Sequence, residues 1–302
     1  MTTREIRRIV VAINPQASFG RSRKVGPEVV ASLKSAGYDV TTIIEVDFDH
    51  LMITTANALK SADALIVVGG DGMVNLAANL VAGSDIPFGL VPSGTGNDMA
   101  RGLGIPFHDT GAAIELLKTC LKLEPRKIDA GRATQLDGST SWFACVFSAG
   151  FDAIVNERAN QMRWPKGRQR YNLAMLRELA ALNPISYDLE IDGEHVSQKA
   201  VLVAVANNLS FGGGMKVTPD ASLDDGLFDV LLVEPLSRLA FLRIFPRVFK
   251  GTHVADPKVS IRRAKRVRVD AEGIVAYADG ERVGRLPIEI EMVPGALKVL
   301  AP

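Results

Sequence analysis

The 302-residue sequence has few of the features that mark small cross-linked, zinc-binding or membrane-spanning proteins. Its two cysteines, Cys120 and Cys145, are too few for a disulfide framework and lack metal-ligand spacing. We expect both to be core thiols of a protein in a reducing compartment. No apolar run reaches the roughly 18 residues that a membrane span needs, and residues 1–8 lack an apolar signal region. The histidines are scattered, and we expect each in a surface or loop position: His50, His108, His195 and His253.

The sequence also has no excess of charge of either sign. Lysine and arginine total 35 against 34 acids, a formal net charge of +1, so no global field attracts nucleic acid. No aromatic residues interleave with the basic residues of 259–269, which argues against single-strand binding there. Apolar residues at 47% and charged residues at 23% are typical of a soluble globular protein, and the length suits two domains.

The stretch from Ala64 to Val81 organises the first half of the chain. Residues 64–68 are apolar without alternation, which predicts a buried parallel strand. Residues 74–81 place apolar side chains on one helical face. Between them lies Gly69-Gly70-Asp71-Gly72. Glycines let backbone amides approach a ligand, and a helix N-terminus favours phosphate.

Asp71 is the unusual component of this loop. A carboxylate repels phosphate unless a metal lies between them, so Asp71 indicates a magnesium-bound nucleotide. The alternative is an ordinary strand-to-helix turn in which Asp71 is the N-cap. The loop by itself leaves both interpretations open.

A second stretch repeats this order of buried strand, glycine loop and helix. Residues 86–91 predict another buried strand, followed by Pro92-Ser93-Gly94-Thr95-Gly96-Asn97-Asp98 and a short helix. In a parallel sheet the two loops would lie side by side, outside the carboxyl ends of the strands, where open α/β sheets bind ligands. Neither the Walker pattern nor the dinucleotide glycine pattern occurs.

Together the two loops resemble the diacylglycerol kinase catalytic domain, in particular soluble bacterial lipid kinases of the diacylglycerol and YegS-like type. The first loop alone is shared with NAD kinases and phosphofructokinase-like enzymes. The resemblance implies ATP between the loops, with one Mg²⁺ between Asp71 and the phosphates. It implies these nucleotide contacts: Asn14, Gly69, Gly70, Asp71, Gly72, Asn75, Thr95, Asn97 and Asp98.

The sequence departs from the family pattern at three places. The family usually has threonine after the second strand, where this chain has Ile44 and Glu45. It usually has threonine where Met73 stands, and often glutamate where Leu76 stands. These departures motivate an alternative, a lipid-binding regulator that kept the fold and lost turnover.

The order of elements predicts an α/β protein. Up to residue 128, strands alternate with helices, which indicates a doubly wound parallel sheet of the NAD kinase and phosphofructokinase-like kind. Residues 129–292 read mainly as strands, and the resemblance makes them an antiparallel β-sandwich that receives the lipid. Residues from about 293 to 302 would return to the first domain. The predicted helices are 25–36, 51–60, 111–122, 155–161, 171–182 and 236–250.

An acidic loop is the second match to the family. Three acids, Asp220, Asp224 and Asp225, fall within six residues beside a glycine. The resemblance implies a structural Mg²⁺ held by the Asp225 carboxylate and the main-chain carbonyls of Ser222 and Leu227. The alternative is an acidic turn that precedes a strand.

Asp279-Gly280-Glu281 is the third match. Asp-Gly is a hairpin signal by itself. Phosphoryl transfer to a lipid also needs a base for the substrate hydroxyl, and we assign that role to Glu281. Asp129 resembles a family acid at the cleft between the domains, or it is a residue of a strand-end turn.

Three basic segments could meet an anionic membrane surface. Residues 163–170 form a basic loop around Trp164, which we interpret as solvated. The helix 236–250 carries Leu239, Leu242, Phe245 and Phe249 on one face, and we expect that face to pack on its own domain despite its interfacial composition. Residues 259–269 predict one exposed edge strand protected by basic side chains.

The sequence therefore predicts a soluble, cytoplasmic, ATP-dependent lipid kinase that contacts the inner face of the membrane transiently. The leading reaction converts diacylglycerol to phosphatidic acid. The alternatives are another lipid alcohol such as a sphingoid base or ceramide, an NAD kinase, and the non-catalytic regulator. A homodimer is one oligomeric state that the sequence leaves open.

Overall fold

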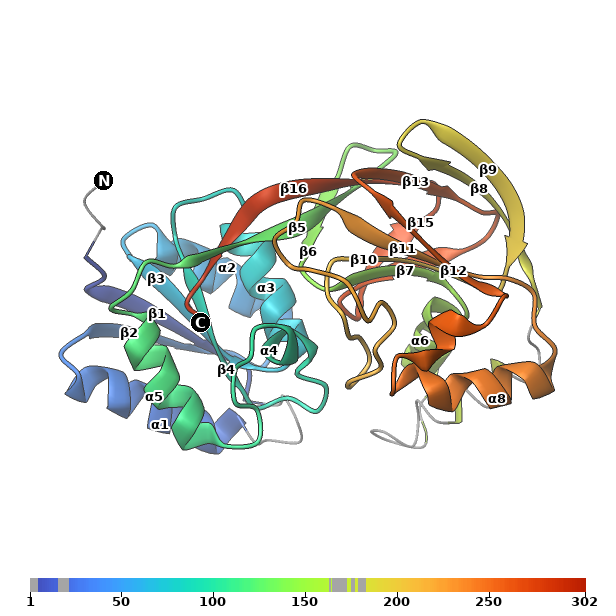
Figure 1. Ribbon diagram of the computed structural model, residues 1–302. Helices are drawn as coiled ribbons and strands as arrows, with labels where there is room; N and C mark the ends of the chain where they lie inside the picture. The colour runs from blue at the N-terminus through green and yellow to red at the C-terminus, as the bar shows by residue number, and fades with distance from the viewer. Residues whose placement is uncertain (1–4, 16–21, 163, 165–172, 175–176, 179–182) are drawn as a thin grey trace. The chain divides into compact units, whose positions relative to one another are not determined.

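The computed structural model describes residues 5–15, 22–162, 164, 173–174, 177–178 and 183–302 (Figure 1). The basic loop predicted at 163–170 and the helix predicted at 171–182 lie largely outside these residues. The chain forms two compact units. The first comprises residues 1–130, 212–214 and 294–302, and the second comprises residues 131–211 and 215–293.

The first unit is built on parallel strands in the order β2-β1-β3-β4. The C-terminal strand β16 joins this sheet beside β4, where Val299 pairs in parallel with Phe88. All six residues of β3 are buried, as a strand covered on both faces requires. The bounds are β1 (Arg8–Ile13), β2 (Asp39–Ile44), β3 (Ala64–Gly69), β4 (Phe88–Pro92) and β16 (Ile288–Val299).

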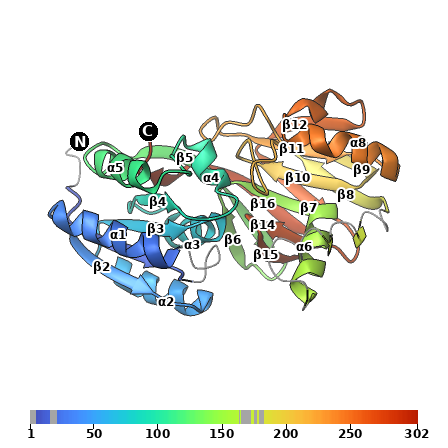
Figure 2. The ribbon, with the colours of Figure 1, turned by 90° about the horizontal axis from the view of Figure 1, so that it is seen from below.

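Helices follow the strands of this sheet, so the predicted doubly wound α/β architecture is confirmed (Figures 1 and 2). Helix α1 contacts α5, and α2 contacts α3, which divides them into two layers. Helix α3 buries one apolar face that includes Val74, Ala77 and Val81, as its spacing predicts. The helices are α1 (Ser22–Ser35), α2 (Phe48–Leu59), α3 (Asp71–Val81), α4 (Asp98–Gly102) and α5 (Thr110–Cys120).

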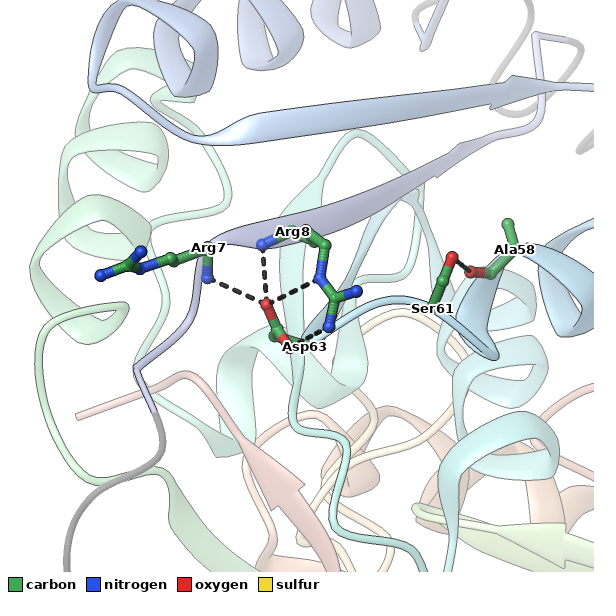
Figure 3. Close-up of polar contacts among 5 residues, drawn as sticks. All are labelled: Arg7, Arg8, Ala58, Ser61 and Asp63. Carbon is green, nitrogen blue, oxygen red and sulfur yellow. Dashed lines mark hydrogen bonds and ion pairs between the residues drawn. The ribbon is translucent and has the colours of Figure 1, made fainter.

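A buried carboxylate fixes the start of the first strand. Asp63 accepts hydrogen bonds from the backbone N–H groups of Arg7 (3.2 Å) and Arg8 (2.9 Å), and the Arg8 guanidinium donates a third at 3.1 Å (Figure 3). The Asp63 side chain is 7% exposed, whereas that of Arg8 is 51% exposed. The Arg8 side-chain hydrogen bond, helped by the backbone bonds, holds the pKa of Asp63 well below its usual range.

This depressed pKa makes stability depend on pH. Because the folded pKa lies below the unfolded value of about 3.9, Asp63 stabilises the fold above that pH, and its contribution is lost as pH falls through the folded pKa. We expect Asp63→Ala to lower the free energy of unfolding at pH 7 by about 1–3 kcal/mol and to flatten the acid limb of stability against pH. Urea denaturation from pH 3 to 7 measures both.

The matched control is Glu115→Gln, which removes an exposed ion pair with Lys118 in the same unit. We expect it to cost about 0.5 kcal/mol or less. Equal losses for the two variants would contradict a special role for Asp63.

The second unit contains two antiparallel layers, so the predicted sandwich is confirmed. One sheet has the order β12-β11-β10-β7-β14-β15; in the other, β16 pairs with β13, β13 with β8 and β8 with β9, while β5 pairs with β16 and β6. The strands are β5 (Arg126–Gln135), β6 (Thr140–Phe143), β7 (Val146–Gly150), β8 (Ile185–Ile191), β9 (Glu194–Ala200), β10 (Leu202–Ala206), β11 (Phe228–Val233), β12 (Val259–Ala264), β13 (Arg266–Asp270), β14 (Val275–Ala278) and β15 (Glu281–Arg285).

The core of this unit lies between the sheets. Phe143 stacks on Phe228 with ring centroids 5.8 Å apart, and Tyr187 donates a buried hydrogen bond to the Ala149 carbonyl at 3.0 Å. Helices α6 (Phe151–Gln161) and α8 (Arg238–Val248) lie on one side of the six-stranded sheet (Figures 1 and 2), and α8 leads to the short helix η2 (Thr252–Ala255). Strands β8 and β9 form a hairpin around Asp192-Gly193, a turn sequence, and both residues have positive φ.

Two stretches each form a pair of strands in different sheets, so the single strand predicted for residues 259–269 was wrong. Residues 141–148 divide into β6 and β7, and the buried Asp279 carboxylate accepts the backbone N–H groups of Ala144, Cys145 and Val146 at the break. Residues 259–269 divide into β12 and β13. There the Asp192 carboxylate accepts the N–H groups of residues 265 and 266. Only β12 is an edge strand, because β13 pairs on both sides.

The histidine prediction was wrong at one position. His253 is 2% exposed, its Nε2 lies 3.0 Å from the Val217 carbonyl oxygen, and burial lowers its pKa. Both cysteines are buried, as predicted. Among the described residues, no helix is long and apolar enough to cross a bilayer.

Candidate active site

The two glycine loops of the first unit pack directly against each other. They begin at the same edge, because Gly69 pairs with Pro92 and the Ser93 N–H donates to the Gly69 carbonyl at 2.8 Å. A Cβ built on Gly94 would lie 2.4 Å from the Cα of Gly70, which is closer than real Cβ contacts. Both positions therefore need glycine, so that backbone can meet backbone.

Asn97 closes the second loop. Its Oδ1 accepts the Gly94 N–H at 2.9 Å, and its Nδ2 donates to the Gly94 carbonyl at 3.0 Å. Asn97 is 5% exposed and has φ of 54°, a left-handed conformation that asparagine tolerates. Thr95, in contrast, is exposed at the tip of the loop. The predicted Asn97 contact thus shapes the loop, and Thr95 is accessible to a ligand.

A carboxylate pair joins the two loops. The Asp98 N–H donates to Asp71 Oδ1 at 2.8 Å, and a Cβ on Gly96 would come within 2.4 Å of Asp71 Oδ2. Burial, and next the negative charge of Asp98, raise the pKa of Asp71. A cation beside Asp71 would relieve both effects, so the residues present fit a magnesium ion here.

Asp98 binds a third loop, which contains Gly213 and Gly214. Its carboxylate accepts the N–H groups of Gly213 and Gly214, each at 2.8 Å, although these residues are 115 and 116 positions away in the sequence. The glycines have positive φ values of 88° and 93°, which other residues rarely adopt. The structure therefore gives Asp98 a loop-anchoring contact that its spacing alone did not predict.

Sequence reasoning missed Arg101 as a site residue. Its guanidinium carbon lies 4.0 Å from the centroid of the Phe107 ring, and a Cβ on Gly214 would lie 3.3 Å from that carbon. Its Nε is buried without a hydrogen-bond partner among the described residues. The available signal was its place three residues after Asp98, on the same short helix.

The remaining predicted contacts lie along the same edge of the sheet. Asn14 directly follows β1, whose last residue Ile13 pairs with Val68. Asn75 is 7% exposed and accepts a hydrogen bond from the Asn79 side chain at 3.3 Å. The hydroxyls of Ser22 and Ser93, both buried, are 2.7 Å apart and tie the start of α1 to the second loop.

Two departures from the family pattern are core residues. Met73 is 3% exposed and Leu76 is 0% exposed. A Cβ on Gly69 would lie 2.3 Å from Met73 Cγ, so Met73 packs beneath the end of β3. The third departure differs, because Ile44 at the end of β2 is 54% exposed.

In the second unit, the predicted Asp-Gly turn connects β14 to β15. Asp279 and Gly280 have φ values of 50° and 89°, as a type I′ hairpin turn requires. Asp279 is 4% exposed, whereas Glu281 is exposed at the start of β15. Desolvation by the surrounding protein nevertheless raises the pKa of Glu281. A raised pKa suits a group that takes up a proton.

Helix α6 braces this hairpin. Glu157 Oε2 accepts the Tyr277 hydroxyl hydrogen bond at 2.8 Å and lies 3.5 Å from Arg282 Nε. Asp129, the acid that resembles a family residue, belongs to the first unit. It is 3% exposed, and its Oδ1 accepts the Gly295 N–H at 2.7 Å, which connects β5 to the bend of β16.

The acidic loop is partly neutralised within the chain. Asp225 accepts the Leu227 N–H at 3.1 Å through Oδ1 and forms an ion pair with Arg263 through Oδ2. The Ser222 hydroxyl donates to Asp224 at 2.9 Å. Among the described residues, no group of three or more histidine, cysteine or acidic side chains could hold a metal. A cation there would depend on main-chain carbonyls.

A buried oxygen in β11, the strand that follows this loop, nevertheless fits a hard cation. Oδ2 of Asp229 is buried without a hydrogen-bond partner among the described residues. Burial is the main cause of the raised pKa of Asp229. The positive charge of Arg263 lowers this pKa, whereas the negative charges of Asp225 and Asp220 raise it further. These oxygen donors are of the type that Mg²⁺ prefers.

Comparison with known proteins gives a consistent result. Residues 8–133 match the model of the diacylglycerol kinase catalytic domain, and residues 145–301 match the YegS C-terminal NAD kinase beta sandwich-like domain. The chain is 42% identical over 300 residues to a diacylglycerol kinase of Mycobacterium tuberculosis, which covers 99% of this chain and 96% of that protein. It is 29% identical to a diacylglycerol kinase of Bacillus subtilis, and that match covers 98% of this chain and 97% of the relative.

A solved structure shares the fold. A diacylglycerol kinase from Bacillus anthracis superposes with a TM-score of 0.72 at 20% identity, covering 100% of this chain and 98% of that chain.

Proposed function

The chain belongs to the diacylglycerol kinase family and is a lipid kinase, and on that premise we propose that it transfers the γ-phosphate of ATP to the hydroxyl of diacylglycerol, which gives phosphatidic acid. The observation that carries the proposal is the interlock of the two glycine loops at the carboxyl ends of β3 and β4. It presents backbone amides, the start of α3 and the Asp71 carboxylate at one place.

The loops would bind and orient the phosphates of ATP. Amides near Gly70 and Gly94, with the N-terminus of α3, favour negative charge. Asp71 would hold the magnesium ion, which neutralises phosphate charge when bound. Arg101 supports the third loop against Gly214.

Glu281 would take the proton from the lipid hydroxyl. The hydroxyl oxygen then forms a bond to the γ-phosphorus, the bond between the γ-phosphorus and the β–γ bridging oxygen breaks, and ADP leaves. This role is supported by the Asp-Gly-Glu motif, by the exposure of Glu281 and by its raised pKa. The chain's contribution is placement and charge neutralisation, which is most of what phosphoryl transfer needs.

The burial of Met73 and Leu76 weakens the case for a regulator without turnover. Two of the three departures that motivated it are buried core residues. The exposed Ile44 is the one that remains. Other lipid alcohols are alternative acceptors.

Phosphate transfer from labelled ATP to diacylglycerol in mixed micelles tests the proposal. We expect labelled phosphatidic acid to form with Mg²⁺ and to be absent when the metal is chelated. A parallel panel contains sphingosine, ceramide and NAD. Transfer to one of these but not to diacylglycerol would replace the proposed substrate, and no transfer to any acceptor would favour the regulator.

We also propose that the acidic loop holds a structural Mg²⁺ through Asp225 and the carbonyls of Ser222 and Leu227. Without ATP, magnesium added to chelator-treated protein should raise the midpoint of thermal unfolding. Asp225→Asn should abolish that rise, whereas Asp137→Asn, on an exposed turn of the same unit, should retain it. An equal rise in both variants would show that the ion does not bind in this loop.

A further inference from the structure

Helix α8 has an inner apolar face that packs on the second unit and an outer apolar face that is exposed. On the inner face Ile244 is buried, and Phe241 contacts Phe151 with ring centroids 4.9 Å apart. Phe245 stacks on Phe241 at 5.6 Å. These contacts attach the helix to the second unit.

The stripe of Leu239, Leu242, Phe245 and Phe249 was expected to pack on its own domain, and only Phe245 does so through its stacking on Phe241. The other three residues belong to an exposed outer face. Leu239 is 80% exposed, Leu242 is 52% exposed and Phe249 is 50% exposed. Pro246 is also exposed and lies on the same face, because the spacings from 239 to 242, 246 and 249 are three, four and three residues. Single exposed apolar side chains are ordinary, but a stripe along one helix needs an explanation.

Positive charge flanks this stripe. No acidic residue occurs between Glu234 and Asp256. At about 100° per residue, Arg243 lies on one side of the stripe and Arg238 lies on the other, while Lys250 follows the end of the helix. All three are exposed, and no ion pair to them is found in the described part of the chain. Arg247 is different, since it is 3.5 Å from Asp256.

We infer that this outer face of α8, defined by Leu239, Leu242, Pro246 and Phe249 with flanking Arg238, Arg243 and Lys250, docks on an anionic phospholipid bilayer. Apolar side chains at the centre would enter the acyl boundary, and the basic side chains would meet the headgroup phosphates. Charge complementarity favours this occupant over a neutral apolar surface. The inference deepens the proposed function, on which it rests, because a diacylglycerol substrate resides in a bilayer.

Sedimentation of the full chain with sucrose-loaded vesicles, without ATP or diacylglycerol, tests the docking surface. The native chain should bind phosphatidylglycerol vesicles more tightly than phosphatidylcholine vesicles. Leu242→Glu should lower binding by about tenfold or more, because it removes an apolar group and adds a negative charge. Leu136→Glu is the matched control, since Leu136 is 83% exposed elsewhere in the same unit, and its binding should equal that of the native chain.

Charge is tested separately. Arg243→Gln should lower binding to phosphatidylglycerol vesicles by about fivefold and leave phosphatidylcholine binding unchanged. Lys199→Gln, at an exposed position on β9, should have no effect. The inference is overturned if the native chain does not bind vesicles, or if the two glutamate variants bind alike. It is also overturned if sedimentation velocity shows that Leu242→Glu dissociates a dimer, because the face would then be a protein interface.

Kinase activity keeps this test distinct from the proposed function. Toward a short-chain diacylglycerol in detergent, Leu242→Glu should turn over at the native rate, whereas toward diacylglycerol in phosphatidylglycerol vesicles it should be slower in proportion to its weaker binding. Vesicle binding without any phosphate transfer would support the docking face and contradict the substrate.

Discussion

Glu281→Gln should lower kcat for phosphate transfer to diacylglycerol by about 10²–10⁴-fold, the usual contribution of a positioned general base. Glutamine keeps the size of the side chain and cannot accept the proton of the lipid hydroxyl. Glu281 is exposed, so the substitution should leave the midpoint of thermal unfolding close to that of the native chain. Initial rates in mixed micelles and thermal melts measure the two effects.

The pH dependence separates a base from a binding residue. Because desolvation raises the pKa of Glu281 above its ordinary 4.5, the carboxylate gains its proton at a higher pH than usual. The rate of the native enzyme should therefore fall on the acid side at a pH above 4.5, and Glu281→Gln should lose that limb. Glu272→Gln, at an exposed turn of the same unit, should behave as the native chain. Phosphate transfer by Glu281→Gln at the native rate would show that Glu281 is not the general base.

Gly94→Ala should abolish the binding of ATP, since the new Cβ would lie 2.4 Å from Gly70 Cα and 2.6 Å from Asn97 Oδ1. The neighbouring atoms are backbone or a side chain that closes the loop, so the loops must separate. We expect a loss of about 1–3 kcal/mol in the free energy of unfolding, as for other overpacked sites. We also expect no rise in melting temperature with Mg²⁺ and millimolar ATP, a condition that stabilises the native chain.

The matched control is Gly111→Ala in helix α5 of the same unit. A Cβ there would lie 3.5 Å from Asp109 Oδ1, its nearest neighbour, which is ordinary van der Waals contact. Alanine in a helix should stabilise by about 0.5–1 kcal/mol and leave the ATP response intact. An undiminished ATP shift in Gly94→Ala would show that the loop contact is dispensable for nucleotide binding.

The sequence by itself determined the local elements. Strand β3, helix α3 and the glycine loop between them follow from apolar periodicity, which is a property of neighbouring residues. The same holds for the Asp192-Gly193 hairpin, because the turn chemistry is local. The family could be named from three short motifs, since each combines a turn with a functional group.

The tertiary structure decided where strands change sheets and what each site residue contacts. The breaks after β6 and after β12 depend on the carboxylates of Asp279 and Asp192, which accept backbone amides far away in the sequence. The attachment of Gly213 to Asp98 likewise joins residues 115 positions apart, so no local pattern could show it.

Helix α8 shows the same limit. Its periodicity predicted an apolar face, but an apolar face can pack on a core or meet another surface, and the two have the same local sequence. Only the fold shows that the inner face is satisfied by Phe151 while Leu239 and Leu242 stay exposed. Periodicity is set by covalent neighbours, whereas partners are set by contacts between distant segments, so sequence determined the elements and the structure determined their contacts.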